Sequence, residues 1–400
     1  MLYSAGLEGH RQLYCDVLTD ILLELGYRVL LVVGLGQPGF ATTWRHITRY
    51  KDHPAVKILD TFSLSSTGKL SVEQIVKLQD TENVAASFFT CADELRTELT
   101  QIATGVTPRF KGRTIGIFGW TQYWYPIEFH FSSRRGIRAL RSYVHELRGY
   151  LLRHRADVHF YENMLPQSRV LDTVFVKDER IVAAKGTFFR WLPDIYKPFN
   201  WPESKQDELE YNEIVPPYKL FLDQHRTKQV LLYFGTAEAY KGYDILLRLA
   251  VSDTETCFVH CGAHNPKVEG PLTPLQDELR SQGRIFETGR FMQSQRAIDE
   301  FLNSVRYFVS THRVYFSSGT MLQALDAGKP VLVPNAGALA HRTLRNHLGS
   351  VYKPQNFADL CTKWNRLKHT PSNSYSVSIG RYMQNYTREG LKGQIEKALS

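Results

Sequence analysis

The stretch that decides the fold of the second half is Tyr315-Phe316-Ser317-Ser318-Gly319-Thr320-Met321-Leu322-Gln323-Ala324-Leu325-Asp326-Ala327-Gly328-Lys329-Pro330-Val331-Leu332-Val333-Pro334. Small hydroxyl residues and a glycine precede an apolar run at helical spacing, which predicts a capped helix that ends at Gly328. Residues 331–333 then have the composition of a buried parallel strand. Free amides and the positive end of a helix at residues 317–320 would bind a phosphate. The same pattern fits an ordinary capped helix of an α/β protein, so both interpretations stay open.

The bulk composition is that of a globular protein with two domains. The chain has 400 residues, more than one core usually spans, and it is 43% hydrophobic and 22% charged. A net charge of +9 favours anionic partners such as nucleotides, phospholipid surfaces or nucleic acid, without choosing among them. No nucleic-acid-binding motif supports the last of these, so no nucleic-acid partner is expected.

The cysteines and the apolar runs indicate a reduced, cytoplasmic protein. The five cysteines include Cys257 and Cys261, but no second pair accompanies them that would complete a zinc site. We therefore expect free thiols and no metal. No signal peptide opens the sequence, and no apolar run is long enough to span a bilayer.

Residues 1–195 predict one Rossmann-like domain. Residues 1–5 and 27–33 read as strands that enclose a glycine loop and a helix ending at Gly26. Within that loop Gly9 serves either a tight turn or the close approach of a substrate. Further strands are predicted at 56–59, 114–118, 156–161, 173–176 and 181–184.

Two segments of this domain have a composition that suits binding. Residues 119–126 carry four aromatic side chains in a loop after a predicted strand, where flat rings suit a sugar or a lipid headgroup, or simply pack. Residues 134–155 predict a basic amphipathic helix. This helix either has an ordinary solvated face or lies on an anionic membrane, which would make the protein peripheral on the inner face.

A second Rossmann-like domain is predicted at residues 226–375, after a linker at 196–225 that is rich in proline, acids and aromatics. Predicted strands at 230–235, 257–261, 284–287 and 307–310 alternate with helical segments. Lys241 follows the first of these strands, where it is either a solvated lysine or the partner of a diphosphate. Residues 376–400 predict a C-terminal helix that packs back toward the first domain.

Taken together, these segments resemble the retaining, family-4-like glycosyltransferases of GT-B architecture over most of the chain. The order and spacing of short motifs carry the resemblance. They are the glycine loop at Gly9, the strand at 156–160, the segment 178–186, Phe234-Gly235 with Lys241-Gly242, Gly289-Arg290, and Ala324-Leu325 with Gly328-Lys329-Pro330-Val331.

The resemblance implies two Rossmann-like domains facing a cleft and an enzyme that moves a hexose from a nucleoside diphosphate sugar to a saccharide or lipid-linked saccharide, as in bacterial surface polysaccharide or glycoconjugate synthesis. No metal or cofactor is implied, because a lysine and a helix end can neutralise the leaving group. The implied donor residues are Gly235, Thr236, Lys241, Arg290, Tyr315, Ser317, Ser318, Gly319, Thr320 and Gln323. The implied acceptor residues are Gly9, His10, Trp120, Tyr123 and Trp124.

Three positions depart from the family pattern. Thr236 stands where the family has an arginine, while Tyr315 and Gln323 stand in place of two glutamates that meet the donor sugar and the ribose. Gln323 can still hydrogen-bond a ribose, whereas Tyr315 cannot place a negative charge beside a sugar. The sequence identifies no catalytic base, and the candidates are His10 and His130. A catalytically impaired GT-B scaffold or binding protein is therefore the alternative.

Overall fold

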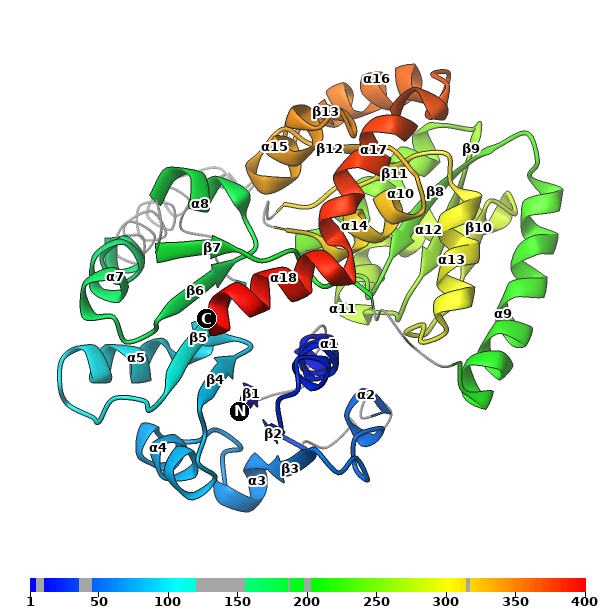
Figure 1. Cartoon of the computed structure of the whole chain (residues 1–400). Coiled ribbons are helices and arrows are strands. Elements are labelled where there is room, and N and C mark those ends of the chain that lie inside the picture. The colour runs from blue at the N-terminus through cyan, green and yellow to red at the C-terminus, as the bar shows by residue number, and fades with distance from the viewer. Residues whose placement is uncertain (5–10, 36–44, 120–154, 186–187, 198–202, 314–316) are drawn as a thin grey trace. The chain divides into compact units, whose positions relative to one another are not determined.

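The computed structural model describes the chain except for residues 5–10, 36–44, 120–154, 186–187, 198–202 and 314–316 (Figure 1). The described residues form two compact units, Met1–Pro198 with Arg388–Ser400, and Phe199–Thr387. Both units alternate strands and helices, which confirms the predicted α/β class with two Rossmann-like domains.

Unit 1 contains a seven-stranded sheet in the order β3-β2-β1-β4-β5-β6-β7. Every pair in it is parallel. The strand order reverses between β1 and β4, which is the place where sheets of this kind bind ligands. The strands are β1 (Leu2–Ser4), β2 (Val29–Val33), β3 (Val56–Asp60), β4 (Ala86–Phe89), β5 (Arg113–Phe118), β6 (Thr173–Val176) and β7 (Phe189–Trp191).

The helices of unit 1 include one from the end of the chain, α18. Arg190 Nη1 donates to Lys397 O at 2.7 Å, and Lys392 Nζ pairs with Glu24 on α1 at 2.7 Å. The C-terminal helix is therefore part of this unit. The helical segments are α1 (Arg11–Glu24), α2 (Arg45–Thr48), α3 (Thr61–Leu64), α4 (Val72–Thr81), η1 (Ala92–Leu95), α5 (Arg96–Ala103), η3 (His159–Met164), α7 (Leu165–Ser168), α8 (Glu179–Lys185) and α18 (Arg388–Leu399).

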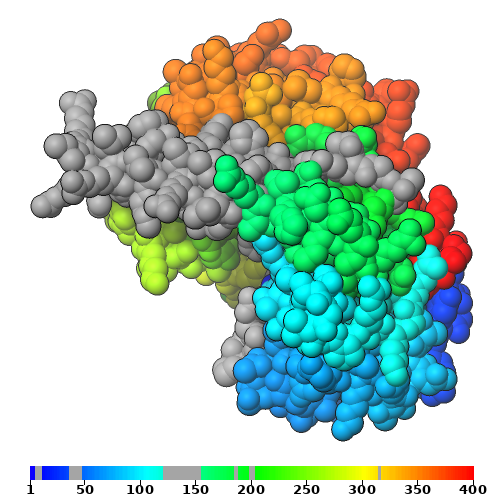
Figure 2. Space-filling model, turned by 90° about the vertical axis from the view of Figure 1, so that its left-hand side faces the viewer, coloured from blue at the N-terminus to red at the C-terminus, as the bar shows by residue number. Residues whose placement is uncertain are grey.

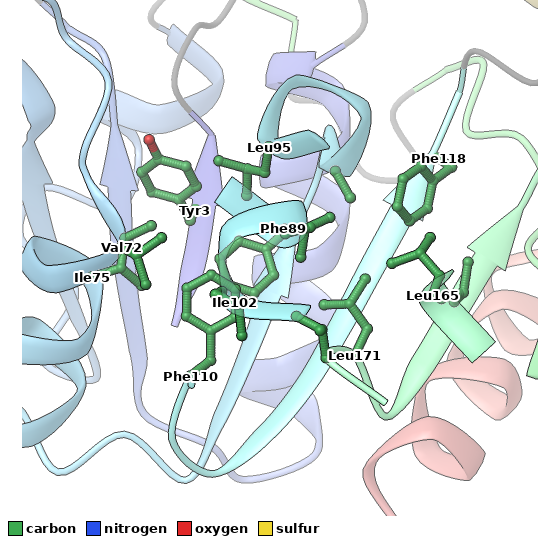
Figure 3. Close-up of a cluster of buried hydrophobic side chains, with 14 of the residues drawn as sticks. Tyr3, Val72, Ile75, Phe89, Leu95, Ile102, Phe110, Phe118, Leu165 and Leu171 are labelled. Atoms are coloured by element: carbon green, nitrogen blue, oxygen red, sulfur yellow. The ribbon is translucent and has the colours of Figure 1, made fainter. Parts of the chain in front are cut away.

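One core of unit 1 lies between its sheet and the layer that contains α4 and α5. Figure 3 shows side chains from the sheet and from both helices meeting there, with Tyr3 and Phe89 beside Ile75 and Ile102. Tyr3 and Phe89 pack edge to face with their ring centroids 6.1 Å apart. In the space-filling view, the N-terminal part of unit 1, coloured blue and cyan, forms one continuous surface (Figure 2).

Two predicted strands of unit 1 are helical instead. The segment predicted as a strand at 156–161 runs into the π-helical turn η3, and the one at 181–184 lies within α8. Residues 156–160 alternate apolar and polar side chains as a strand does, and the short apolar run at 181–184 does not distinguish a strand from a helix. In α8, Ile181 is buried while Ala183 is exposed, so only one side of the run faces the core.

Unit 2 contains two three-stranded parallel sheets in the orders β10-β9-β8 and β11-β12-β13. β8 and β11 are in contact, so the strands continue as 10-9-8-11-12-13 with the order reversing between β8 and β11. The strands are β8 (Gln229–Phe234), β9 (Thr256–Cys261), β10 (Ile285–Glu287), β11 (Phe308–Val309), β12 (Val331–Pro334) and β13 (Gly349–Tyr352).

The helical segments of unit 2 flank these strands along the chain, and none of the described helices is both long and apolar enough to cross a bilayer. They are α9 (Lys205–Gln224), η5 (Ala239–Lys241), α10 (Tyr243–Ser252), α11 (Pro266–Glu269), η6 (Gly270–Leu272), α12 (Thr273–Ser281), α13 (Gln295–Ser304), α14 (Gly319–Asp326), α15 (Gly337–Arg345), α16 (Phe357–Leu367), η7 (Ser372–Tyr375), α17 (Ser376–Met383) and η8 (Gln384–Tyr386).

The predicted linker at 196–225 is wrong for most of its length, because α9 occupies it. Ser204 and Asp207 form a capping box at the start of α9, and Pro216 and Pro217 lie inside the helix. Buried Tyr218 stacks on Phe301 of α13 with ring centroids 4.1 Å apart. This packing outweighs the two prolines, which read as breakers in the sequence. The predicted helix at 376–400 is likewise divided into α17 in unit 2 and α18 in unit 1.

Gly242→Ala tests the close packing of the β8–α10 loop on the end of β11. Gly242 has a φ of +72°, and a Cβ added there would lie 2.1 Å from the carbonyl oxygen of Thr311. The control is Gly328→Ala, because Gly328 also has a φ of +72° but has no atom within 4 Å of an added Cβ. We expect the control to lower the free energy of unfolding by about 1 kcal/mol, and Gly242→Ala to lower it by about 1–3 kcal/mol more. Equal thermal unfolding midpoints for the two variants would contradict this packing.

Candidate functional site

The carboxyl end of β8 carries a loop that depends on a glycine. Gly235 has a φ of +105°, and a Cβ added there would lie 2.9 Å from Lys241 Nζ. The Gly235 amide donates to Cys261 O at 2.8 Å, which ties the loop to the end of β9. A side chain at position 235 would thus compete with the Lys241 ammonium for the space above the strand.

Lys241 presents a half-buried ammonium at this edge of unit 2. Burial lowers its pKa, and the nearby Glu238 opposes that shift. Within the part of the chain that the structure describes, no carboxylate forms an ion pair with the ammonium. The ammonium lies 5.8 Å from the centre of the Tyr240 ring, and a partly desolvated cation with no ion-pair partner favours the binding of an anion.

The end of β11 is fixed directly against the Lys241 loop. Thr311 Oγ1 donates to the carbonyl oxygens of Lys241 and Gly242 at 3.0 and 2.9 Å. The Arg313 amide donates to Tyr240 O at 2.7 Å, and the Arg313 guanidinium pairs with Asp244 on α10 at 2.7 Å. The chain that leads toward α14 therefore starts beside Lys241, at the point where the strand order reverses.

His312 is a titratable residue of this edge that the sequence analysis missed. Its Nδ1 lies 2.7 Å from Ser310 Oγ. Burial, and then the Lys241 ammonium, lower the pKa of His312 to about 3, so the ring is neutral near pH 7. The available signal was its place directly after a predicted strand, at the edge of a parallel sheet where ligands bind.

The start of α14 confirms the predicted capped helix. Ser318 Oγ accepts from the Met321 amide at 3.4 Å and lies 2.9 Å from Thr320 Oγ1. The amides of Gly319 and Thr320 fall in the first turn, where a helix offers donors without partners of its own. Gln323 follows one turn further along α14.

Arg342 is a second residue that the sequence analysis missed. It lies on α15 and is only 1% exposed, yet its Nη1 donates to Ser317 Oγ at 2.6 Å. A buried guanidinium therefore holds the residue that precedes the cap of α14. Nothing in the sequence pattern separates Arg342 from an ordinary basic residue in the last turn of a helix.

The other predicted donor residues are placed differently. Arg290 pairs with Glu213 of α9 at 2.7 Å, and its Nε lies 3.9 Å from a carboxylate oxygen of Glu210. The carbonyl oxygen of Thr236 accepts from the Tyr233 hydroxyl at 3.0 Å. Tyr315 lies outside the described residues.

The predicted acceptor residues also lie outside the described part of the chain, although their flanks are described. The residues concerned are Gly9, His10, Trp120, Tyr123, Trp124 and His130, together with most of the predicted helix at 134–155. Asp93 accepts from the Gly119 amide at 2.7 Å and from the Tyr161 hydroxyl at 3.0 Å. Arg11 pairs with Glu94. Polar and charged groups thus border both segments at the carboxyl edge of the unit 1 sheet.

Two Rossmann-type units of this topology define the GT-B fold, which is the fold of the solved structures that the chain resembles. HepE of Anabaena, solved with UDP-glucose, matches with a TM-score of 0.62 and 14% identity over 100% of this chain and 98% of HepE. Sucrose-phosphate synthase of Thermosynechococcus elongatus matches with a TM-score of 0.63 and 14% identity over 97% and 92% of the two chains.

A third similar structure is WaaG, a glycosyltransferase involved in lipopolysaccharide biosynthesis. It matches with a TM-score of 0.57 and 11% identity over 100% of this chain and 98% of WaaG. No protein-family model and no curated protein sequence matches the chain. The fold is therefore that of GT-B glycosyltransferases, at a level of identity that shows the fold alone.

His312→Gln tests the neutral state of His312 through the pH dependence of stability. The pKa of His312 is lowered to about 3 from 6.5, so below pH 6.5 the unfolded chain takes up a proton that the folded chain does not. This contribution to the free energy of unfolding is fully present above pH 6.5 and falls by roughly 1.4 kcal/mol per pH unit toward pH 3.

Denaturant titrations measure the free energy of unfolding. Between pH 7 and pH 5 this free energy should fall by about 2 kcal/mol more in the wild type than in His312→Gln. The exposed His369, changed to Gln, is the control and should leave the wild-type pH dependence unchanged. If the free energy of unfolding varies with pH in the same way in the wild type and in His312→Gln, the lowered pKa of His312 is contradicted.

Proposed function

We propose that this protein is a glycosyltransferase that moves a hexose from a nucleoside diphosphate sugar to a saccharide or lipid-linked saccharide acceptor. The observation that carries the proposal is the half-buried Lys241 ammonium at the reversal of strand order in unit 2, which forms no ion pair with a carboxylate of the described residues. The GT-B fold supports it, since HepE has this fold and was solved with UDP-glucose.

The chemistry of the proposed reaction matches the charges at this edge. As the bond from the sugar to the diphosphate breaks, negative charge grows on the departing phosphate. Lys241 would stabilise this charge together with the amides of Gly319 and Thr320 at the start of α14. Arg342 holds Ser317 in place behind them at 2.6 Å. In this proposal the protein's own cation supplies what a metal would otherwise provide, so the donor site needs no metal or other cofactor.

We assign the acceptor to unit 1, at Gly9, His10, Trp120, Tyr123 and Trp124. The described flanks support this assignment, because Asp93 contacts Gly119 directly before the aromatic segment. Bacterial surface polysaccharide or glycoconjugate synthesis is the proposed setting, supported by the role of WaaG in lipopolysaccharide biosynthesis.

The proposed location is cytoplasmic, with residues 134–155 on the anionic inner face of the membrane. The protein should co-sediment with vesicles of anionic lipid and not with vesicles of neutral lipid. Co-sedimentation should be lost when Arg138 and Arg141 are changed to Glu, and unchanged binding in that variant would exclude residues 134–155 as the membrane contact.

An impaired scaffold or binding protein is the second candidate. The departures at Thr236, Tyr315 and Gln323 favour it. Tyr315 and Gln323 stand where the GT-B glycosyltransferases that the sequence resembles have glutamates. Incubation with UDP-, GDP- and ADP-hexoses, followed by measurement of the released nucleoside diphosphate with and without acceptor saccharides, separates the candidates. Turnover supports the enzyme, nucleotide binding without turnover supports the scaffold, and no nucleotide binding by folded protein contradicts both.

Lys241→Met should weaken UDP binding about 10- to 100-fold, because it removes a charged contact to the diphosphate worth about 1.5–3 kcal/mol. The matched control is Lys205→Met, which removes the same charge from an exposed position at the start of α9. Titration calorimetry with UDP measures both variants. An unchanged dissociation constant for Lys241→Met would remove this lysine from the proposed site.

A further inference from the structure

Two histidines and two glutamates, none of them assigned to the donor, converge at the carboxyl ends of β9 and β10. They are His260, His264, Glu269 and Glu287, and one ligand atom from each lies within 4.8 Å of all the others. His260 is the next-to-last residue of β9, Glu287 ends β10, and Glu269 is the last residue of α11. Cys261 points to the opposite face of β9 from His260, so the thiols are not part of this cluster.

The hydrogen bonds of His260 leave one of its ring nitrogens without a partner. Its Nε2 lies 3.2 Å from Gly235 O, which can only accept, so Nε2 carries the proton. Nδ1 is then unprotonated and carries a lone pair. It is buried without a hydrogen-bond partner, in a side chain that is 0% exposed. It faces Glu269 Oε1 at 3.7 Å. Two acceptors that face each other in a buried place are unfavourable unless a cation lies between them.

The arrangement around His260 is also that of a metal-ligating histidine. Such a residue usually donates its second ring N–H to a backbone carbonyl or carboxylate, which fixes the ring. Gly235 O provides that carbonyl. The outer oxygens of both carboxylates are held as well, because the Asn265 amide donates to Glu269 Oε2 at 2.5 Å and Arg280 Nη2 donates to Glu287 Oε2 at 2.8 Å.

The inner oxygens of the two carboxylates share the side-chain amide of Gln276, and His264 Nδ1 lies at hydrogen-bond distance from one of them. Gln276 Nε2 contacts Glu269 Oε1 at 3.3 Å, Glu287 Oε1 at 3.4 Å and the Tyr243 hydroxyl at 3.0 Å. An amide nitrogen has two hydrogens for these three acceptors. His264 Nδ1 lies 2.9 Å from Glu269 Oε1, and its side chain is 43% exposed, which gives the cluster access to solvent.

We propose that His260 Nδ1, His264 Nδ1, Glu269 and Glu287 bind one divalent transition-metal ion, with Zn²⁺ as the expected metal. Tetrahedral Zn²⁺ takes nitrogen and oxygen ligands at about 2.0–2.2 Å, which separates neighbouring ligand atoms by about 3.3 Å. The separations of 2.9 and 3.7 Å from Glu269 Oε1 to the two histidines bracket that value. Two neutral imidazoles and two carboxylates give the ion a neutral site.

The site is structural and goes beyond the proposed transfer reaction. Its ligands connect β9, the β9–α11 loop, α11 and β10, and His260 reaches the carbonyl of Gly235 in the loop that also carries Lys241. A metal there would stabilise the folded form of unit 2 by binding the folded chain and not the unfolded one. The proposal can therefore be tested without any donor or acceptor.

The test uses the full chain without a histidine tag, stripped with a chelator and then titrated with ZnCl₂ by calorimetry. We expect one Zn²⁺ per chain, a rise in the thermal unfolding midpoint on Zn²⁺ addition, and a visible Co²⁺ spectrum typical of tetrahedral coordination. His264→Ala and Glu287→Gln should each weaken Zn²⁺ binding at least 10-fold. Both positions are exposed or half-buried, so the metal-free variants should unfold near the midpoint of the metal-free wild type.

His369→Ala is the control, because it removes an exposed histidine far along the chain on the segment after α16. It should bind Zn²⁺ as the wild type does. Absence of stoichiometric Zn²⁺ binding by the wild type would overturn the proposal. Unchanged binding in the double variant His264→Ala/Glu287→Gln would overturn it as well, since the ion would then lie elsewhere.

Discussion

The close approach of main chain to main chain around the β8 loop is the constraint on which the candidate site depends. A Cβ on Gly262 would lie 2.0 Å from Gly235 O, and one on Gly242 would lie 2.1 Å from Thr311 O. The loop is thus held between the ends of β9 and β11 with no room for side chains at these contacts. This packing puts Lys241 beside the strand ends, at the reversal of strand order. Its ammonium is then available to the proposed diphosphate.

The electrostatics of this edge follow from that packing. Burial opposes the charge of Lys241 and of His312, and the two groups respond differently. Lysine has a high ordinary pKa and stays positive, whereas histidine becomes neutral. Arg342 holds Ser317 in place beside this edge. The Lys241 ammonium therefore gives the edge a positive charge that an anionic ligand would neutralise.

The α/β class and many of the strands could be predicted from the sequence, because buried strands and capped helices leave strong local patterns. The cap at Ser318 and the strand at Val331–Pro334 are examples, but β4, β7 and β13 were not predicted. The segments 156–161 and 181–184 were predicted wrongly, since the first alternates apolar and polar residues as a strand does and the second is a short apolar run that fits either structure. The helix across Pro216 and Pro217 was missed because tertiary packing of Tyr218 overrides a local signal that reads as a breaker.

The candidate site could be predicted only where a residue type is tied to a loop after a strand, as for Gly235 and Lys241. Arg342 acts through a contact between separate helices, which has no local pattern. The same is true of the histidine and glutamate cluster. The sequence directed attention to Cys257 and Cys261, while His260, His264, Glu269 and Glu287 are brought together by the loop into α11 and by the pairing of β9 with β10.

The most direct test of the donor site is a crystal structure of the full chain grown with UDP. The account predicts the diphosphate in contact with Lys241 Nζ and with the amides of Gly319 or Thr320. A diphosphate bound elsewhere, with Lys241 turned toward a carboxylate of the protein, would contradict it.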